Sequence, residues 1–278
     1  MKWGIIGTGN MGKVWLHALS SSKSVSEKNI FLYNRSFLKA YELKNDYPDV
    51  HIVQAMDTVI RECDIILLCA KPKDIIDIAK KLKDKINEDQ CVISITSSIL
   101  VDQLGAILHH NTARIIPSIT NRALSGATLV TFNENMDDGF KEILWDCCSE
   151  FSTPIEISDE HVRISSDIVS CGPAFISFIL ESMIEAAVKQ TGLPKEEASK
   201  MAETMIIGYG KLLDENIYTF STLKEKVMVK GGITGEGMKA LEGTFQNIFE
   251  PVFESTHLKF DSEKKIIGEM VQKIHSES

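Results

Sequence analysis

The sequence has little positive charge and few of the residue patterns that mark a metal or nucleophilic site. It carries 30 lysines and arginines against 39 aspartates and glutamates, for a formal net charge of −9. An acidic chain of this kind argues against general affinity for nucleic acid, which needs a basic stripe. The seven histidines are scattered, with no Ser-His-Asp pattern and no metal-ligand spacing. These absences favour a small-molecule ligand and predict no metal site.

Paired cysteine motifs and long apolar runs are also missing. The six cysteines show no CxxC spacing, and four lie in apolar runs, as reduced core cysteines do. A redox function of the adjacent pair Cys147-Cys148 is the alternative. Met1 leads directly into the first predicted strand without a signal peptide, and no apolar stretch reaches the roughly 18 residues of a membrane span. We therefore expect a cytoplasmic enzyme that does not associate with membranes.

What the first half does contain is an alternation of short apolar runs with amphipathic segments. The predicted strands are 3–6, 30–33, 65–69, 92–95, 114–116, 128–132 and 155–157, and the predicted helices between the first five are 11–21, 36–46, 74–85 and 99–109. Such alternation predicts a parallel sheet with helices on both faces. The expected fold class is α/β, with an N-terminal Rossmann-like doubly wound sheet over residues 1–157.

Strand signals almost vanish after Pro154, and helical patterns replace them. Residues 159–191 are apolar on nearly every face. Their large apolar side chains include Ile176, Phe178, Leu180, Met183 and Val188. A helix that is apolar all round must be buried all round, and a second copy of the chain can do this best. We therefore expect residues 158–278 to form an all-α dimerisation domain, with the central helix of a monomeric bundle as the alternative.

A glycine-rich loop follows the first predicted strand and leads into a helix. It reads Gly7-Thr8-Gly9-Asn10-Met11-Gly12, a GxGxxG pattern. The first glycine permits a tight turn, the second lets the backbone approach a pyrophosphate, and the third lets helix and strand pack closely. Because the loop opens a series of βα units, it indicates a dinucleotide site rather than a turn with chance glycines.

The end of the second predicted strand indicates which dinucleotide binds. An NAD enzyme has Asp or Glu there to hold the ribose 2′-hydroxyl, whereas this chain reads Asn34-Arg35-Ser36. A guanidinium beside a hydroxyl and an amide suits a 2′-phosphate, so we expect NADPH, with NADH the less favoured cofactor. A surface arginine without a ligand is the alternative. Ala70-Lys71-Pro72 and Thr96-Ser97 follow later strands at the ligand-binding edge, although Lys71 also fits a solvated charge.

A second glycine cluster lies in the C-terminal half. Residues 227–243, VMVKGGITGEGMKALEG, hold five glycines in a region that otherwise reads as helical. Glycine costs about 1 kcal/mol against alanine in a helix interior, so the cluster is either a plain loop or a place where backbone N–H groups approach a ligand. The absence of lysine between Arg163 and Lys189 disfavours a 3-hydroxyacid dehydrogenase.

Several motifs make the chain resemble the pyrroline-5-carboxylate reductase family over nearly its whole length. The opening GIIGTGNMG is similar to the family's N-terminal fingerprint, AKP at 70–72 to its AVKP, SCGPAF at 170–175 to its GSGPAY, and KGGIT at 230–234 to its PGGTT. The resemblance implies a two-domain homodimer that transfers hydride from NADPH to the imine of 1-pyrroline-5-carboxylate and gives L-proline. Whether the dimers assemble further is left open by the sequence.

The resemblance also implies which residues hold the substrate. Thr234 would be the catalytic residue and would bind the substrate carboxylate together with N–H groups of a helix that starts at Gly235, a favourable place for an anion. The other substrate-binding residues that it implies are Asp159, Gly231, Gly232 and Ile233. Since the cofactor supplies the reducing chemistry, no acid–base pair is required.

The chain departs from the family pattern at a few positions. Ser118 stands where the family has an asparagine, Met56 where a cofactor-side asparagine is common, and Met228, Lys230 and Ile233 alter the glycine motif. These departures are similar to those of the ComER-type late-competence proteins of bacilli, a divergent branch of the family. They leave open a reductase of a different small imine or keto acid, and a nucleotide-binding regulatory dimer without turnover.

Overall fold

The computed structural model describes residues 1–277, which divide into two compact units. Unit 1 comprises Met1–Pro173 together with the chain from Ser255 onward, and unit 2 comprises Ala174–Glu254. The chain therefore leaves unit 1 once and returns to it with its last helix. A functional boundary between residues 157 and 158 stays a prediction.

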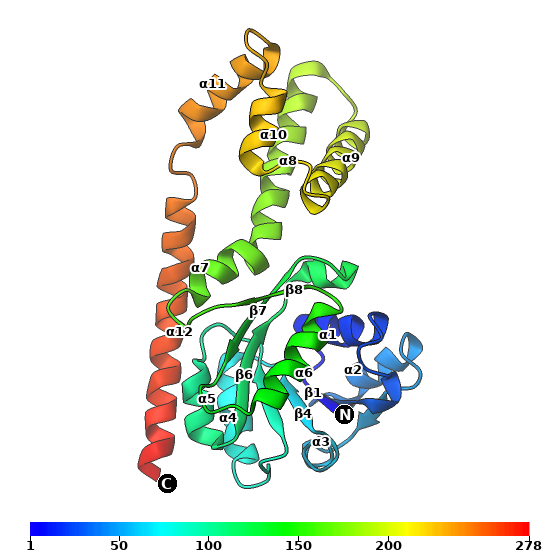
Figure 1. Cartoon of the computed structure of the whole chain (residues 1–278), viewed down its shortest axis with the longest axis vertical. Helices are drawn as coiled ribbons and strands as arrows, with labels where there is room; N and C mark the ends of the chain where they lie inside the picture. The colour runs from blue at the N-terminus through cyan, green and yellow to red at the C-terminus, as the bar shows by residue number, and fades with distance from the viewer. Residues whose placement is uncertain (278) are drawn as a thin grey trace. The chain divides into compact units, whose positions relative to one another are not determined.

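Within the described residues, unit 1 is built on an eight-stranded sheet in the order β3-β2-β1-β4-β5-β6-β7-β8 (Figure 1). Neighbouring strands are parallel except β6 and β7, which are antiparallel. The strands are β1 (Trp3–Ile6), β2 (Ile30–Tyr33), β3 (His51–Val53), β4 (Ile65–Leu68), β5 (Cys91–Ser94), β6 (Asn111–Ile116), β7 (Ala127–Phe132) and β8 (Thr153–Glu156). The first six strands follow the order of doubly wound dinucleotide-binding sheets, which confirms the predicted Rossmann-like fold.

Helices cover both faces of this sheet, because successive side chains of its apolar strands point to opposite sides. Ile65 and Leu67 of β4 join one buried cluster with α1 and α6, whereas Ile66 and Leu68 join another with α3, α4, α5 and α12 (Figure 1). The unit 1 helices are α1 (Asn10–Ser21), η1 (Glu27–Asn29), α2 (Phe37–Tyr41), η2 (Glu42–Asn45), α3 (Met56–Glu62), α4 (Pro72–Leu82), α5 (Val101–Leu108), η3 (Ile119–Ala123), α6 (Asp138–Ser149), α7 (Val162–Ser166) and the π-helical η4 (Asp167–Cys171).

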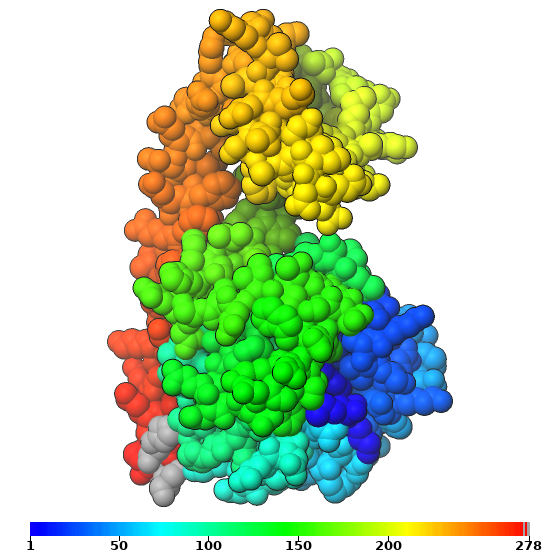
Figure 2. Space-filling model, in the orientation of Figure 1, coloured from blue at the N-terminus to red at the C-terminus, as the bar shows by residue number. Residues whose placement is uncertain are grey.

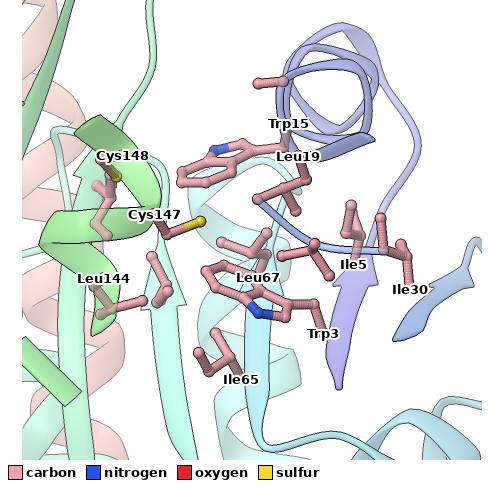
Figure 3. Close-up of a cluster of buried hydrophobic side chains, with 14 of the residues drawn as sticks. Trp3, Ile5, Trp15, Leu19, Ile30, Ile65, Leu67, Leu144, Cys147 and Cys148 are labelled. Carbon is pink, nitrogen blue, oxygen red and sulfur yellow. The ribbon is translucent and has the colours of Figure 1, made fainter. Parts of the chain in front are cut away.

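The adjacent cysteines of α6 belong to the apolar core. Figure 3 shows Cys147 and Cys148 in the same cluster as Trp15 of α1 and Trp3 of β1. Burial raises the pKa of the Cys147 thiol to about 12, so the reactive thiolate is scarce at neutral pH. All six cysteines are free thiols, and five of them are buried. The pair therefore behaves as core packing rather than as a redox centre.

The last helix, α12 (Glu250–Glu277), contributes to the core of unit 1. Its buried residues Ile267, Val271 and Ile274 pack in the cluster formed by α3, α4 and α5. In Figure 2 the red atoms of this helix lie against the cyan and green atoms of that side of the unit. The end of the sequence therefore completes a layer that begins near the start of the sequence.

Unit 2 consists of helices and contains an apolar surface that its own chain leaves open. Its helices are α8 (Gly172–Thr191), α9 (Lys195–Asp214), α10 (Phe220–Val227), α11 (Ile233–Phe245) and the first turn of α12. Within the single described chain, α8 has no buried residue, and Phe178 is 70% exposed. The apolar helix that the sequence predicted is present, but burial on all sides requires something beyond this chain.

The helical stretch Val162–Thr191 is unusually long and apolar. By length and composition alone it is long and apolar enough to cross a bilayer, contrary to our expectation from the sequence. A helix that packs inside a protein or against a partner has the same length and composition.

Candidate functional site

The glycine loop after β1 has the geometry of a close backbone approach. Gly7 has φ +104°, and a Cβ there would overlap the carbonyl oxygen of Cys69 at the end of β4. A Cβ at Gly12 would overlap the carbonyl oxygen of Gly7. By contrast, a Cβ at Gly9 would meet no described atom within 4 Å. Gly7 and Gly12 are therefore needed for packing, whereas Gly9 leaves open space beside the loop.

Helix α1 begins at this loop with its first N–H groups available. Gly9 is the N-cap and offers no side-chain acceptor, and the first turn carries no acidic residue. Helix geometry leaves the N–H groups of Asn10, Met11 and Gly12 without partners inside the helix. Together with the helix dipole, these groups favour an anion such as a pyrophosphate at this point.

The segment after β2 is tied to the glycine loop by Asn34. Its Oδ1 accepts a hydrogen bond from the N–H of Thr8 at 3.2 Å, and its Nδ2 donates to the carbonyl oxygen of Ser36 at 3.0 Å. The side chains of Arg35 and Ser36 are exposed beside it. The structure thus gives Asn34 a backbone-bracing role and leaves Arg35 and Ser36 accessible; binding of a 2′-phosphate by these residues stays a prediction.

The other predicted cofactor residues lie at the same edge of the sheet. Because β1, β2, β4 and β5 are parallel neighbours, their carboxyl ends meet there. Lys71 is the exposed N-cap residue of α4, Pro72 follows in its first turn, and Ala70 precedes both. Thr96 and Ser97 follow β5 and are half-buried. The predicted cofactor residues are thus brought together, and their contacts with a cofactor remain predictions.

A buried arginine that sequence reasoning missed holds Asp159. The Arg114 side chain is 1% exposed, and its Nη2 lies 2.5 Å from Oδ1 of Asp159. Its other partners are Thr131 Oγ1 at 3.0 Å and the carbonyl oxygen of Ile99 at 3.2 Å. Burial lowers the pKa of Arg114, and Asp159 opposes that shift. A charged residue within the apolar run of β6 was the available signal; a substrate role for Asp159 stays a prediction.

The second glycine cluster forms a tight turn before α11. Gly231 has φ +75°, and the N–H of Gly232 donates to the carbonyl oxygen of Val229 at 2.9 Å. Helix α11 begins at Ile233, not at Gly235 as we expected, because Gly232 takes the extended N-cap conformation. Within unit 2, Gly232 supplies no side-chain cap, so helix geometry leaves the N–H groups of Ile233 and Thr234 unpaired in the helix.

The side chains at this helix start are accessible in the single chain. Ile233 is 94% exposed, and Thr234 is also exposed. The turn therefore presents a hydroxyl and helical N–H groups at one place, an arrangement suited to a carboxylate. Among residues 1–277, His, Cys, Asp and Glu form no group of three that could hold a metal ion.

Comparison with known proteins identifies the family. The chain is 40% identical over 263 residues to ComE operon protein 4 of Bacillus subtilis, a match that covers 95% of this chain and 96% of the relative. It is 31% identical over 268 residues to pyrroline-5-carboxylate reductase 3 of the same organism, covering 95% of this chain and 97% of the relative. The chain belongs to the pyrroline-5-carboxylate reductase family.

Further comparisons agree with this membership of the pyrroline-5-carboxylate reductase family. Residues 159–262 match the family described as pyrroline-5-carboxylate reductase dimerisation, and residues 2–98 match the family described as NADP oxidoreductase coenzyme F420-dependent. Pyrroline carboxylate reductase of Plasmodium falciparum, solved with NADP bound, shares the fold with a TM-score of 0.79 and 22% identity over 98% of both chains. This chain therefore has the fold of an NAD(P)-dependent reductase, with a helical segment of the family's dimerisation type.

Proposed function

We propose that the protein is an NADPH-dependent reductase that converts 1-pyrroline-5-carboxylate to L-proline. The observation that carries the proposal is the start of α11, where Thr234 and two unpaired helical N–H groups follow a glycine turn. A second helix start with unpaired N–H groups, that of α1, follows β1 of the dinucleotide-type sheet. Family membership supplies the reaction class that joins a nucleotide site to a carboxylate site.

The residues have simple tasks in this proposal. NADPH, when bound, supplies the hydride for the imine carbon. The N–H groups of Asn10 and Met11 hold the pyrophosphate, and Arg35 with Ser36 holds the 2′-phosphate. The Thr234 hydroxyl and the N–H groups at the start of α11 hold the substrate carboxylate. Binding fixes the orientation of the imine, which is the main contribution the protein makes to such a transfer.

The absorbance of the reduced nicotinamide tests this function directly. Purified protein with NADPH and 1-pyrroline-5-carboxylate is expected to consume NADPH and form proline. Consumption with another cyclic imine or a keto acid, but not with this substrate, would assign the enzyme a different substrate. NADPH binding without consumption of any of them would instead favour a regulatory nucleotide-binding dimer.

Arg35 is expected to set the preference for NADPH over NADH. Arg35→Ala removes an exposed guanidinium whose charge-assisted bonds to a phosphate contribute roughly 2 kcal/mol, so NADPH should bind about 30-fold more weakly. NADH affinity should not change, because NADH lacks the 2′-phosphate. Titration of both cofactors measures the two dissociation constants. Equal effects on NADPH and NADH would contradict the assignment.

We also propose a homodimer formed through unit 2. Phe178 and Met183 of α8, with Leu241 and Phe245 of α11, line an apolar groove of about 910 Å³. A second copy that covers this surface would bury α8 on its remaining sides, which explains its apolar composition without a membrane. A cytoplasmic location remains a prediction.

Charge placed on the groove is expected to separate the dimer. The wild-type protein should scatter light with twice the chain mass of 31.0 kDa, and the double variant Phe178→Glu/Met183→Glu should scatter as one chain. The matched control is Leu38→Glu, because Leu38 is a 71% exposed apolar residue on α2 of unit 1. A wild-type monomer, or dissociation of the control as well, would rule out this interface.

A further inference from the structure

A fully buried carboxylate lies at the start of the π-helical segment η4. Asp167 is 0% exposed, and its oxygens accept hydrogen bonds from Arg163 Nη2 at 2.8 Å and Nε at 3.3 Å. The hydroxyl of Thr256 on α12 donates to Oδ2 at 2.7 Å. His257 Nε2 lies 3.6 Å from the same oxygen. The carboxylate is thus held from two segments that are almost ninety residues apart.

Stability alone does not account for this pair. The Arg163 side chain is only 15% exposed, so both charges have lost most of their water, and that cost offsets much of their attraction. Well-packed apolar residues often serve stability equally well in such a place. A π-helical turn is also rare and occurs frequently at functional sites. The pair therefore points to a requirement for a fixed geometry.

The guanidinium of Arg163 connects this carboxylate to the predicted cofactor loop. Its Nη1 donates to Ser97 Oγ at 3.4 Å, in the loop after β5, and its Nη2 lies 3.5 Å from Cys171 Sγ. The Phe260 ring packs against the same guanidinium, with 5.9 Å between Cζ and the ring centre. Arg163 is therefore held by Asp167 and Phe260, and its Nη1 donates one hydrogen bond to the loop after β5.

The π-helical segment is also bonded to the loop after β6. Ser118 Oγ donates to the carbonyl oxygen of Val169 at 2.9 Å, and Ser170 Oγ donates to the carbonyl oxygen of Pro117 at 3.3 Å. Strands β5 and β6 belong to the second half of the dinucleotide-type sheet, which begins at β4, and the strand order reverses between β1 and β4. The loops after β5 and β6 lie on this side of that switch point. In dinucleotide-binding sheets this second half takes the second mononucleotide.

We infer that Arg163, held by Asp167, is a positioning residue for the nicotinamide half of the cofactor. It acts through Ser97 and the loop after β5 and needs no direct bond to the cofactor. The adenosine half would bind beside β1 and β2, on the other side of the point where the strand order reverses, so its binding should not depend on this pair. The inference rests on the proposed use of NADPH.

The test compares NADPH with 2′-phospho-ADP-ribose, which lacks the nicotinamide ring. The double variant Arg163→Met/Asp167→Leu removes the bond to Ser97 and leaves no unpaired buried charge. It should bind NADPH about tenfold more weakly, the equivalent of one lost hydrogen bond, and bind 2′-phospho-ADP-ribose as the wild type does. The conservative variant Arg163→Lys should show the same selective loss, because lysine lacks the planar fork that bridges Asp167 and Ser97.

Isothermal titration measures both ligands, and thermal unfolding checks each variant. Arg61→Met is the matched control, since Arg61 is exposed and pairs only with the neighbouring Glu62 among the described residues; it should bind both ligands normally. If the double variant does not fold, Arg163→Lys decides. Equal loss of both ligands, or no loss, overturns the positioning role while NADPH binding by the wild type still supports the proposed function. Failure of the wild type to bind NADPH overturns both.

Discussion

Replacement of Thr234 by alanine is expected to lower kcat/KM for 1-pyrroline-5-carboxylate by about 100-fold, or roughly 2.7 kcal/mol. The hydroxyl is the side-chain donor at a helix start whose other donors are backbone N–H groups. Its loss should leave the substrate carboxylate less firmly held and the imine poorly aligned. Steady-state kinetics with NADPH measure the effect. Helix α11 should remain intact, because the Thr234 side chain is exposed.

Two further variants make this result specific. Thr234→Ser retains the hydroxyl and should recover most of the activity. Thr244→Ala is the matched control on the same helix, where the Thr244 hydroxyl bonds only to the carbonyl oxygen of Ala240 within the described chain; its kinetics should equal those of the wild type. Equal losses in Thr234→Ala and Thr234→Ser, or no loss in either, would contradict a hydroxyl role.

Alanine at Gly12 is expected to damage the fold, whereas alanine at Gly9 should damage only cofactor binding. The Gly12 variant must move the Gly7 backbone, which should cost about 2–3 kcal/mol of the free energy of unfolding and lower the Tm by roughly 5–10 °C. The Gly9 variant has open space for its methyl group, so its Tm should match the wild type. That methyl group would occupy the space through which a pyrophosphate approaches, and NADPH affinity should fall at least tenfold.

The two glycine variants are informative as a pair. Calorimetry gives the Tm without ligand, and titration gives the NADPH dissociation constant. A lowered Tm for Gly9→Ala would show that this glycine serves packing. Unchanged NADPH binding in a stable Gly9→Ala protein would place the dinucleotide elsewhere.

Much of the sheet could be predicted because its strands are apolar throughout. The predicted ranges 3–6 and 30–33 coincide with β1 and β2, and β4 differs by one residue. Strand β3 was missed because it has three residues at the sheet edge and starts at the exposed His51, so neither length nor hydropathy marks it. The predicted strand 128–132 is present as β7, but its antiparallel direction was not anticipated, because the direction of a strand depends on the connection before it and not on the strand's own residues.

Only those features of the sites that depend on neighbouring residues in the sequence could be predicted. The glycine loop was found because its spacing is local, whereas the bracing of Thr8 by Asn34 and the pairing of Arg114 with Asp159 join distant segments. The start of α11 was misplaced because Gly235 and Gly237 have low helix propensity. Both lie inside the helix, which continues through them although each glycine costs about 1 kcal/mol relative to alanine.

The return of α12 to unit 1 limits how early unit 1 can complete its folding during synthesis. Ile267, Val271 and Ile274 complete a buried layer whose other members are strands and helices between Ile6 and Leu108, which are synthesised earlier. During translation, one apolar face of unit 1 therefore stays uncovered until α12 has left the ribosome, although domains generally fold as they emerge. Unit 1 thus contains the start of the sequence, yet its core is complete only after unit 2 has been synthesised.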